Sequence, residues 1–306
     1  MSASTFNQAR SLSALTRVAP IGQSCPAGCT EAVAERGSGR FHCTVCGTIW
    51  LPSRRSFEYA DSYPADRAHY DTAVAHCKQV TLQAWLRRLG TTLAGKRVLE
   101  IGFGGGATLD WMQDQGATVF GQEPVAANRV EAIRRGIPRD QVSAELQDFS
   151  GRAFDLVLYL DSFEHVLEPR SHLAALNELV APGGRALLVL PVADCLSRHL
   201  LRRWWPHDIP DHWVFYSSQG LIKLWREFGW RPVVRFFPWK CLSARTIALH
   251  YKMKAGRLPP LGPLAEVAVW LNFGERGLIF EKVADGEGPD SYRGMSAASA
   301  RRGAST

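Results

Sequence analysis

Short hydrophobic runs alternate with longer amphipathic stretches over residues 95–284. The runs predict buried strands, which are RVLEI (97–101), TVFGQ (118–122), FDLVLYL (154–160), RALLVLP (185–191), PVVRFF (232–237) and GLIFEKV (277–283). The stretches between them predict helices over 107–116, 125–135, 169–180 and 218–228, and the pair Gly183-Gly184 predicts a helix stop and turn. Strands that alternate with helices are typical of an α/β fold with a mostly parallel open sheet.

The flanking segments differ in composition and set the expected domain boundaries. We expect a flexible N-terminus over 1–22, a cysteine-containing segment over 23–55, a helical lid or connector over 56–94 and a disordered tail over 285–306. Within the main domain, 95–284, residues 241–274 form an insertion before the last strand. Its apolar stretch LPPLGPLAEVAVWLNF predicts a helix that packs in the core, with a homodimer face and a membrane-surface contact as alternatives.

Composition and charge narrow the class of protein. The chain has 306 residues, of which 46% are hydrophobic, enough for a substantial core. Its net charge of +7 is scattered along the sequence, which favours an ordinary basic surface over a nucleic-acid-binding face. There is no apolar run of about 18 residues, and the N-terminus lacks the apolar centre of a signal peptide. The sequence therefore predicts a cytoplasmic protein without a transmembrane segment.

A glycine-rich loop, EIGFGGG, follows the first strand of the main domain. Gly102, Gly104 and Ala107 satisfy the G-x-G-x-x-A pattern that lets a nucleotide cofactor approach the backbone. Glu123, at the end of the next strand, is placed to accept hydrogen bonds from ribose hydroxyls, in either NAD or S-adenosylmethionine. Glu100 separates the two cofactors, because a carboxylate there repels a pyrophosphate but attracts an ammonium or sulfonium group.

Three later segments carry a specific resemblance: FDLVLYLDSFEHVLEP (154–169), LNELVAPGGRALLVLP (176–191) and DHWVFYSSQGLIKLWREFGW (211–230). Together with the glycine loop, they resemble a class I S-adenosylmethionine-dependent methyltransferase over roughly residues 70–284. The resemblance implies a Rossmann-like, seven-stranded, mostly parallel sheet with helices on both faces. It also implies transfer of a methyl group from S-adenosylmethionine to an acceptor.

The same resemblance implies a set of cofactor-binding residues. The loop residues would lie against the methionine and ribose part, Glu100 would face the amino end, and Glu123 would hold the ribose hydroxyls. Glu145 and Leu146 would contact the adenine, although family members often have Gly-Asp where this chain has Ala144-Glu145. Asp148 is the alternative acid, and Glu145 is then a solvated loop residue. The full expected set is Glu100, Gly102, Phe103, Gly104, Gly106, Glu123, Glu145, Leu146, Leu160 and Asp161.

Four of the seven cysteines form a cluster near the N-terminus, Cys25, Cys29, Cys43 and Cys46, with the spacing C-x3-C-x13-C-x2-C. Four thiolates suit a tetrahedral structural zinc ion, and the spacing resembles a zinc ribbon with an unusually wide first pair. His42 is an alternative ligand, and free thiols are the other interpretation. Some RNA methyltransferases also carry such a ribbon, but this segment is not rich in lysine. Cys77, Cys195 and Cys241 are expected to be plain buried residues.

Three histidines are candidates for the base that methyl transfer to a hydroxyl or amine requires. His165 follows the strand 154–160, and His207 and His212 lie in the aromatic segment WWPHDIPDHWVFY. Each has a structural alternative as a loop-bracing residue, and Asp161, Glu164 and His165 are also spaced to gather a divalent cation.

The sequence thus predicts a methyltransferase acting on a small-molecule or sugar-like acceptor. O- or N-methylation is favoured over C-methylation, with no nucleic-acid partner. The alternatives are an RNA-modifying enzyme, an NAD-dependent oxidoreductase and a non-catalytic cofactor-binding protein.

Overall fold

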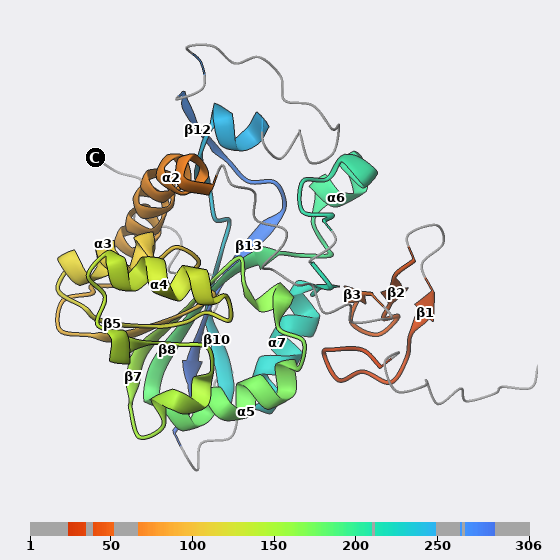
Figure 1. The fold of residues 1–306 in the computed structure, drawn as a ribbon. Coiled ribbons are helices and arrows are strands. Elements are labelled where there is room, and N and C mark those ends of the chain that lie inside the picture. Colours follow the sequence, from red (N-terminus) through yellow and green to blue (C-terminus); the bar gives the residue numbers. More distant parts are fainter. Residues whose placement is uncertain are drawn as a thin grey trace, which may run out of the picture.

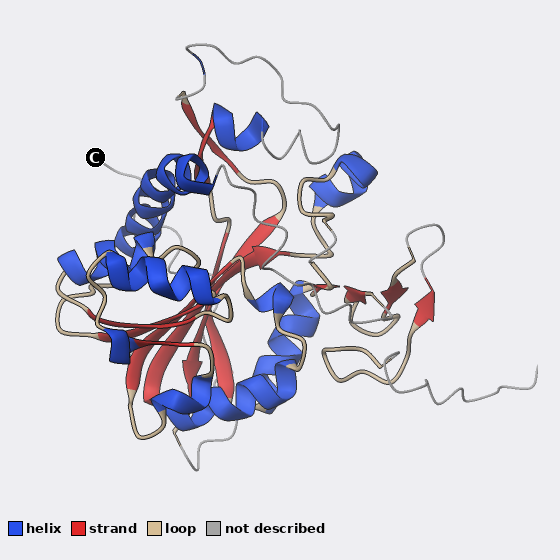
Figure 2. Ribbon diagram, viewed as in Figure 1, coloured by secondary structure: helices blue, strands red, loops and turns tan. Residues whose placement is uncertain are grey.

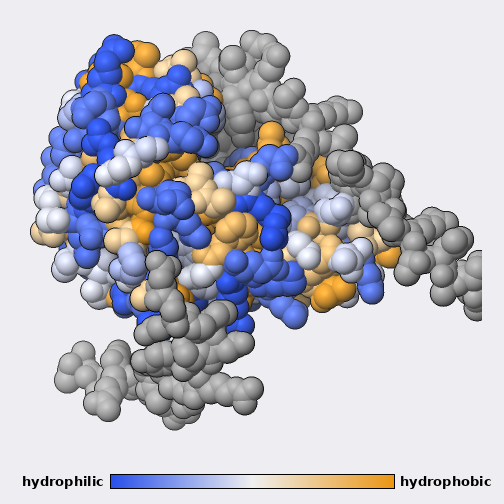
Figure 3. Space-filling view, turned by 90° about the horizontal axis from the view of Figure 1, so that it is seen from below, coloured by the Kyte–Doolittle hydropathy of each residue, from blue (hydrophilic) through white to orange (hydrophobic). Residues whose placement is uncertain are grey.

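The computed structural model describes residues 24–34, 39–51, 67–209, 212–248, 264 and 267–284. The predicted flexible N-terminus (1–22), the disordered tail (285–306) and most of the apolar stretch in the insertion lie outside these residues. No helix in the described ranges is long and apolar enough to cross a membrane. On the face drawn in Figure 3, hydrophobic residues form small patches between hydrophilic ones.

A seven-stranded sheet forms the centre of the main domain (Figure 1). Its spatial order is β10-β13-β8-β7-β4-β5-β6. The four contacts among β8, β7, β4, β5 and β6 are parallel, whereas β13 is antiparallel to both β8 and β10. The strands are β4 (Arg97–Ile101), β5 (Thr118–Gln122), β6 (Val142–Ser143), β7 (Phe154–Leu160), β8 (Val180–Pro191), β10 (Trp230–Phe236) and β13 (Glu275–Lys282). This arrangement confirms the predicted Rossmann-like fold class.

The topology brings distant segments to one edge of the sheet. The parallel strands β4, β5, β6, β7 and β8 all end there, and β10, antiparallel to β13, ends there too. Because β13 runs the opposite way, it begins at this edge, where Glu275 pairs with Pro191. Loops that follow six strands and the start of the seventh therefore lie at this edge, where ligands bind in open α/β sheets.

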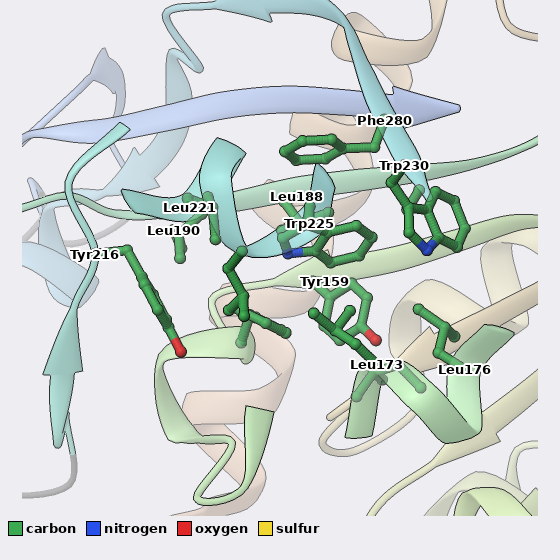
Figure 4. Close-up of a cluster of buried hydrophobic side chains, with 14 of the residues drawn as sticks. Tyr159, Leu173, Leu176, Leu188, Leu190, Tyr216, Leu221, Trp225, Trp230 and Phe280 are labelled. Atoms are coloured by element: carbon green, nitrogen blue, oxygen red, sulfur yellow. The ribbon is translucent and has the colours of Figure 1, made fainter. Parts of the chain in front are cut away.

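Helices cover both faces of the sheet, as Figure 2 shows. On one face lie α2 (Arg67–Arg88), α3 (Ala107–Asp114) and α4 (Ala126–Arg134), and on the other lie α5 (Pro169–Leu179) and α7 (Ser218–Glu227). Trp225 of α7 packs between two sheet residues (Figure 4), stacked on Phe280 at 4.8 Å between ring centroids and edge-on to Tyr159 at 5.8 Å. Shorter elements are α6 (Leu196–Leu201) and the 3-10 turns η1 (Arg139–Gln141), η2 (Leu146–Phe149), η3 (Phe163–His165) and η4 (Arg202–Trp204).

Two local predictions are corrected. The glycine pair Gly183-Gly184 does not stop α5, which already ends at Leu179; the pair lies at the irregular start of β8, where Gly183 has φ +81°. The described part of the predicted apolar helix is a strand, β12 (Ala268–Leu271), paired with β11 (Lys240–Ser243). β-Branched Val267 and Val269 favour this extended form, and both are exposed rather than in the core.

The cysteine-containing segment folds as a small antiparallel sheet that is completed by the main domain. The strands β1 (Val33–Ala34), β2 (Phe41–His42) and β3 (Ile49–Trp50) are followed in the spatial order by β9 (Val214–Phe215). Ser217 Oγ, at the start of α7, donates a hydrogen bond to the main-chain carbonyl of Cys46. We call residues 24–51 the ribbon; its last strand is tied to the segment that carries His207 and His212.

Gly220 allows the ribbon to approach α7 closely. A larger residue at this position therefore tests the contact between the ribbon and α7. A Cβ atom at residue 220 would collide with Thr48 Oγ1 and lie 3.1 Å from Cys46 Sγ. Although alanine normally stabilises a helix over glycine by about 1 kcal/mol, we expect Gly220→Ala to lower the free energy of unfolding by about 1–3 kcal/mol. Urea denaturation measures the change. Gln219→Ala, at an exposed position one residue away, is the control, and equal effects of the two substitutions would contradict this docking.

Candidate active site

The glycine loop after β4 is built from residues in the left-handed backbone region. Gly102, Gly104 and Gly106 have φ of 70°, 62° and 81°. Added Cβ atoms at Gly102 and Gly106 would lie 2.7 Å from Ser162 Cβ and 2.8 Å from Ala132 Cβ, so these two positions exclude larger residues. At Gly104 nothing lies within 4 Å of that position. The loop is thus packed from behind at two glycines and open at the third.

Glu100 lies in the core directly behind this loop, only 3% exposed. Both of its carboxylate oxygens lie within hydrogen-bond reach of Thr108 Oγ1, at 2.8 and 2.6 Å. Burial raises the pKa of Glu100 to about 7, against the opposing effects of Thr108 and Lys78. Thr108 was not predicted from the sequence, although a hydroxyl in the first turn of the helix after a glycine loop is a readable partner for a buried acid.

Glu123 closes the other side of the loop at the end of β5. Its Oε2 accepts a hydrogen bond from the amide of Gly104 at 2.9 Å, and its Oε1 accepts one from the amide of Val125 at 3.0 Å. The side chain is 5% exposed. Glu100, Gly104 and Glu123, which come from two neighbouring strands, therefore meet around one loop as the sequence pattern predicts.

The other predicted cofactor residues have varied placements. The Phe103 side chain lies in the core against Gly121, so only its main chain belongs to the loop. Leu146 is buried, whereas Glu145 and Asp148 are exposed, and Asp148 is hydrogen bonded to Ser143 Oγ. Leu160 is half-buried at the end of β7. The roles predicted for these residues remain predictions.

The four predicted zinc-ligating cysteines come together in the ribbon. All are buried, and their Sγ atoms lie within 4.8 Å of one another. The Cys25–Cys46 distance of 3.6 Å is close to the ~3.8 Å that tetrahedral Zn–S bonds require. The Cys25 contact lowers the pKa of the Cys46 thiol to about 4, and the same contact, with burial, raises the pKa of Cys25. The donor set and its spacing fit a zinc ion.

The three candidate histidines gather at the edge of the sheet where β7 ends and β13 begins. The rings of His165 and His212 are 4.7 Å apart, and those of His207 and His212 are stacked at 6.2 Å. His212 is 6% exposed, and burial, followed by the neighbouring His165 and His207, holds the pKa of His212 well below its usual range. A carboxylate oxygen of Glu164 and one nitrogen from each of His165 and His212 lie within 4.8 Å of one another.

The predicted cation site of Asp161, Glu164 and His165 does not form, because Asp161 lies apart from the other two residues. Its carboxylate accepts hydrogen bonds from Lys240 Nζ, with both oxygens at 2.6 Å. Lys240 also lies 3.1 Å from Oε1 of Glu275, whose same oxygen is 3.2 Å from His207 Nε2. Lys240 and Glu275 were missed in the sequence analysis, although Glu275 lies just before the predicted strand 277–283, where an acid is a readable signal.

The ribbon also contacts the segment that carries two of the histidines. Arg40, 7% exposed, donates hydrogen bonds to the main-chain carbonyl of His212 and to the carboxylate of Asp208, both at 3.1 Å. Its guanidinium lies 4.7 Å from the ring centroid of Phe215. The ribbon thus contacts the chain on both sides of the gap between the described residues 209 and 212, through a side chain at Asp208 and the backbone at His212.

Comparisons with known proteins agree with this arrangement. A family model described as a methyltransferase domain matches residues 74–234. Ubiquinone biosynthesis O-methyltransferases of Ruegeria pomeroyi and Roseobacter denitrificans are 32% identical over 192 residues and 33% identical over 184 residues, respectively. These matches cover 54% and 51% of this chain, and 75% and 71% of the relatives. A solved S-adenosylmethionine-dependent methyltransferase of Thermotoga maritima is 16% identical, with a TM-score of 0.47, and the match covers 72% of this chain and 97% of that chain. The chain belongs to the methyltransferase-domain family and is a class I S-adenosylmethionine-dependent methyltransferase.

Proposed function

We propose that this enzyme methylates a hydroxyl group of a small-molecule acceptor. The observation that carries the proposal is the group of three histidines at the edge of the sheet where six strands end and the glycine loop begins. A hydroxyl must lose a proton as it attacks, and imidazole is the side chain whose ordinary pKa suits that task near neutral pH. The relatives named O-methyltransferases support the same class of acceptor.

The residues around the glycine loop fit S-adenosylmethionine, which when bound would supply an electrophilic methyl group. The open position at Gly104 leaves room for the ligand against the backbone. Glu100 would provide a buried negative charge for the amino end, and Glu123 would accept hydrogen bonds from the ribose hydroxyls. The zinc ion that we infer for the ribbon has a structural role, since its four sulfur ligands would leave no open coordination position.

The first test is binding of S-adenosylhomocysteine measured by calorimetric titration, with NADH as the control ligand. We expect micromolar binding of S-adenosylhomocysteine alone. Glu123→Ala should weaken this binding by about 10- to 100-fold, because it removes charged hydrogen-bond acceptors. Circular dichroism should show an unchanged fold. Unchanged affinity would remove Glu123 from the site, and binding of NADH would contradict the cofactor assignment.

The raised pKa of Glu100 generates a pH prediction. A cationic amino group favours the carboxylate, so binding to the folded protein must first remove the proton from Glu100 at low pH. Affinity for S-adenosylhomocysteine should therefore rise from pH 5.5 and level off above about pH 7. Glu100→Gln should bind more weakly and flatten this profile. Thr108→Val removes an interaction that lowers the pKa, so it should move the plateau to higher pH.

The zinc assignment is tested by metal content. Cys43→Ser combined with Cys46→Ser should lower the zinc content of the purified protein, measured by atomic absorption, and should lower the unfolding temperature. Cys195→Ser, a buried cysteine outside the cluster, is the matched control and should retain the metal. Full zinc retention by the double variant would overturn the assignment.

A further inference from the structure

A set of three charged side chains, of which one is exposed and two are largely buried, faces one of the three histidines. It consists of Asp161 after β7, Lys240 at the start of β11 and Glu275 at the start of β13. Glu275 is 3% exposed and the side chain of Lys240 is 13% exposed. Lys240 and Glu275 lie beyond residues 74–234, which the methyltransferase-domain family model matches.

The charges in this set do not balance. Burial opposes the charged form of Lys240, but Asp161 and Glu275 outweigh it and raise the pKa of Lys240. Burial likewise opposes ionisation of Glu275, but Lys240 and His207 hold the pKa of Glu275 well below its usual range. With two carboxylates and one ammonium, the set carries one excess negative charge beside His207. An excess charge of this sign would compensate a positive charge that develops on the His207 ring during the reaction.

We propose that His207 is the general base of the methyl transfer and that Glu275 and Lys240 are the residues that position it, an inference that rests on the proposed function. Glu275 Oε1 faces His207 Nε2 at 3.2 Å, while Lys240 fixes Glu275 and joins it to Asp161. Asp161 precedes Ser162, the residue that packs against Gly102. The dyad of His207 and Glu275 is thereby held at a fixed place relative to the cofactor loop.

The geometry assigns separate tasks to the two ring nitrogens of His207. A proton on Nε2, directed at Glu275, leaves the lone pair on Nδ1 to accept a proton from the acceptor. The ring N–H is not yet aligned for a full hydrogen bond to Glu275, and such bonds often tighten only when substrate binds. Trp205, whose ring centroid is 5.2 Å away, and the stacked ring of His212 limit the orientations of His207.

His212 lacks this support. Glu164 Oε1 is 3.8 Å from its Nε2, and its Nδ1 has no hydrogen-bond partner within the described part of the chain. Its burial and its two histidine neighbours favour the neutral form. His212 therefore serves as a neutral ring against which His207 stacks, rather than as the group that takes up the proton.

In the proposed step the acceptor O–H bond breaks and its proton moves to Nδ1 of His207. An electron pair on the same oxygen forms the new bond to the methyl carbon. The electron pair of the breaking C–S bond remains on sulfur, which becomes a neutral thioether. The imidazolium lies beside the excess negative charge of Glu275, Lys240 and Asp161, so the charge that develops on His207 is compensated within the site.

The test is a measurement of the tautomer and pKa of His207 by nitrogen-15 NMR of its imidazole, in protein without the methyl acceptor. The His207 signals are assigned as those that disappear in His207→Gln. The charged and titratable groups around this ring are Glu275, Lys240, His212, Glu164, His165, Asp161, and Asp208 with Arg40. We expect the neutral ring to carry its proton on Nε2. Glu275→Gln should lower the pKa of His207 by about one unit, and Lys240→Met should raise it by a similar amount.

Glu281→Gln is the matched control, because Glu281 lies on the same strand but pairs with Arg185 and Arg231. It should leave the pKa of His207 unchanged. If a charge-removing variant fails to fold, the tautomer of wild-type His207 still tests the proposal. The variants Glu275→Asp and Lys240→Arg, which retain the charges, can then replace the charge-removing ones. A neutral His207 protonated on Nδ1, or a pKa that Glu275→Gln does not lower, overturns the dyad. If wild-type protein does not bind S-adenosylhomocysteine, the proposed function itself is contradicted. Failure of the dyad and failure of the proposed function are therefore distinguishable.

Discussion

The close packing of Gly102 against Ser162 is the constraint on which the rest of the site depends. β4 and β7 are parallel neighbours, so the segments that follow them leave the sheet side by side. A Cβ atom at residue 102 would lie 2.7 Å from Ser162 Cβ, which excludes any side chain there. This contact fixes the cofactor loop on one side and Asp161 on the other. From Asp161, charged contacts lead first to Lys240, then to Glu275 and finally to His207.

The ribbon adds a second fixed point on the opposite side of the histidines. Its β3 pairs with β9, and Arg40 holds the carbonyl of His212 and the carboxylate of Asp208. The contact with His212 is buried, where hydrogen bonds to charged groups contribute most, whereas the Asp208 carboxylate is partly exposed. The segment that holds the four cysteines therefore contacts the segment that carries His207 and His212 directly.

Much of the fold and the cofactor loop could be predicted from the sequence, because both depend on local patterns. The runs at 97–101, 118–122 and 154–160 coincide with strands β4, β5 and β7, and Glu100, Gly104 and Glu123 meet as their spacing indicates. The glycine pair at 183–184 was misassigned since glycine marks a positive φ without specifying which element contains it. The strand β12 was mistaken for a helix because a short apolar stretch has no decisive periodicity.

The set of Asp161, Lys240 and Glu275 could not be predicted from the sequence, for a different reason. Lys240 and Glu275 are 35 positions apart, as their numbers show, and come together only because β10 ends, and the antiparallel β13 begins, at the same edge of the sheet. A pattern argument finds acids and bases one at a time, whereas the function of this set comes from its excess charge and from which histidine it faces. The three histidines look equivalent along the chain. The fold distinguishes them, because burial holds the pKa of His212 well below its usual range, whereas a buried carboxylate oxygen of Glu275 lies 3.2 Å from Nε2 of His207. This difference is the reason for proposing His207 as the base.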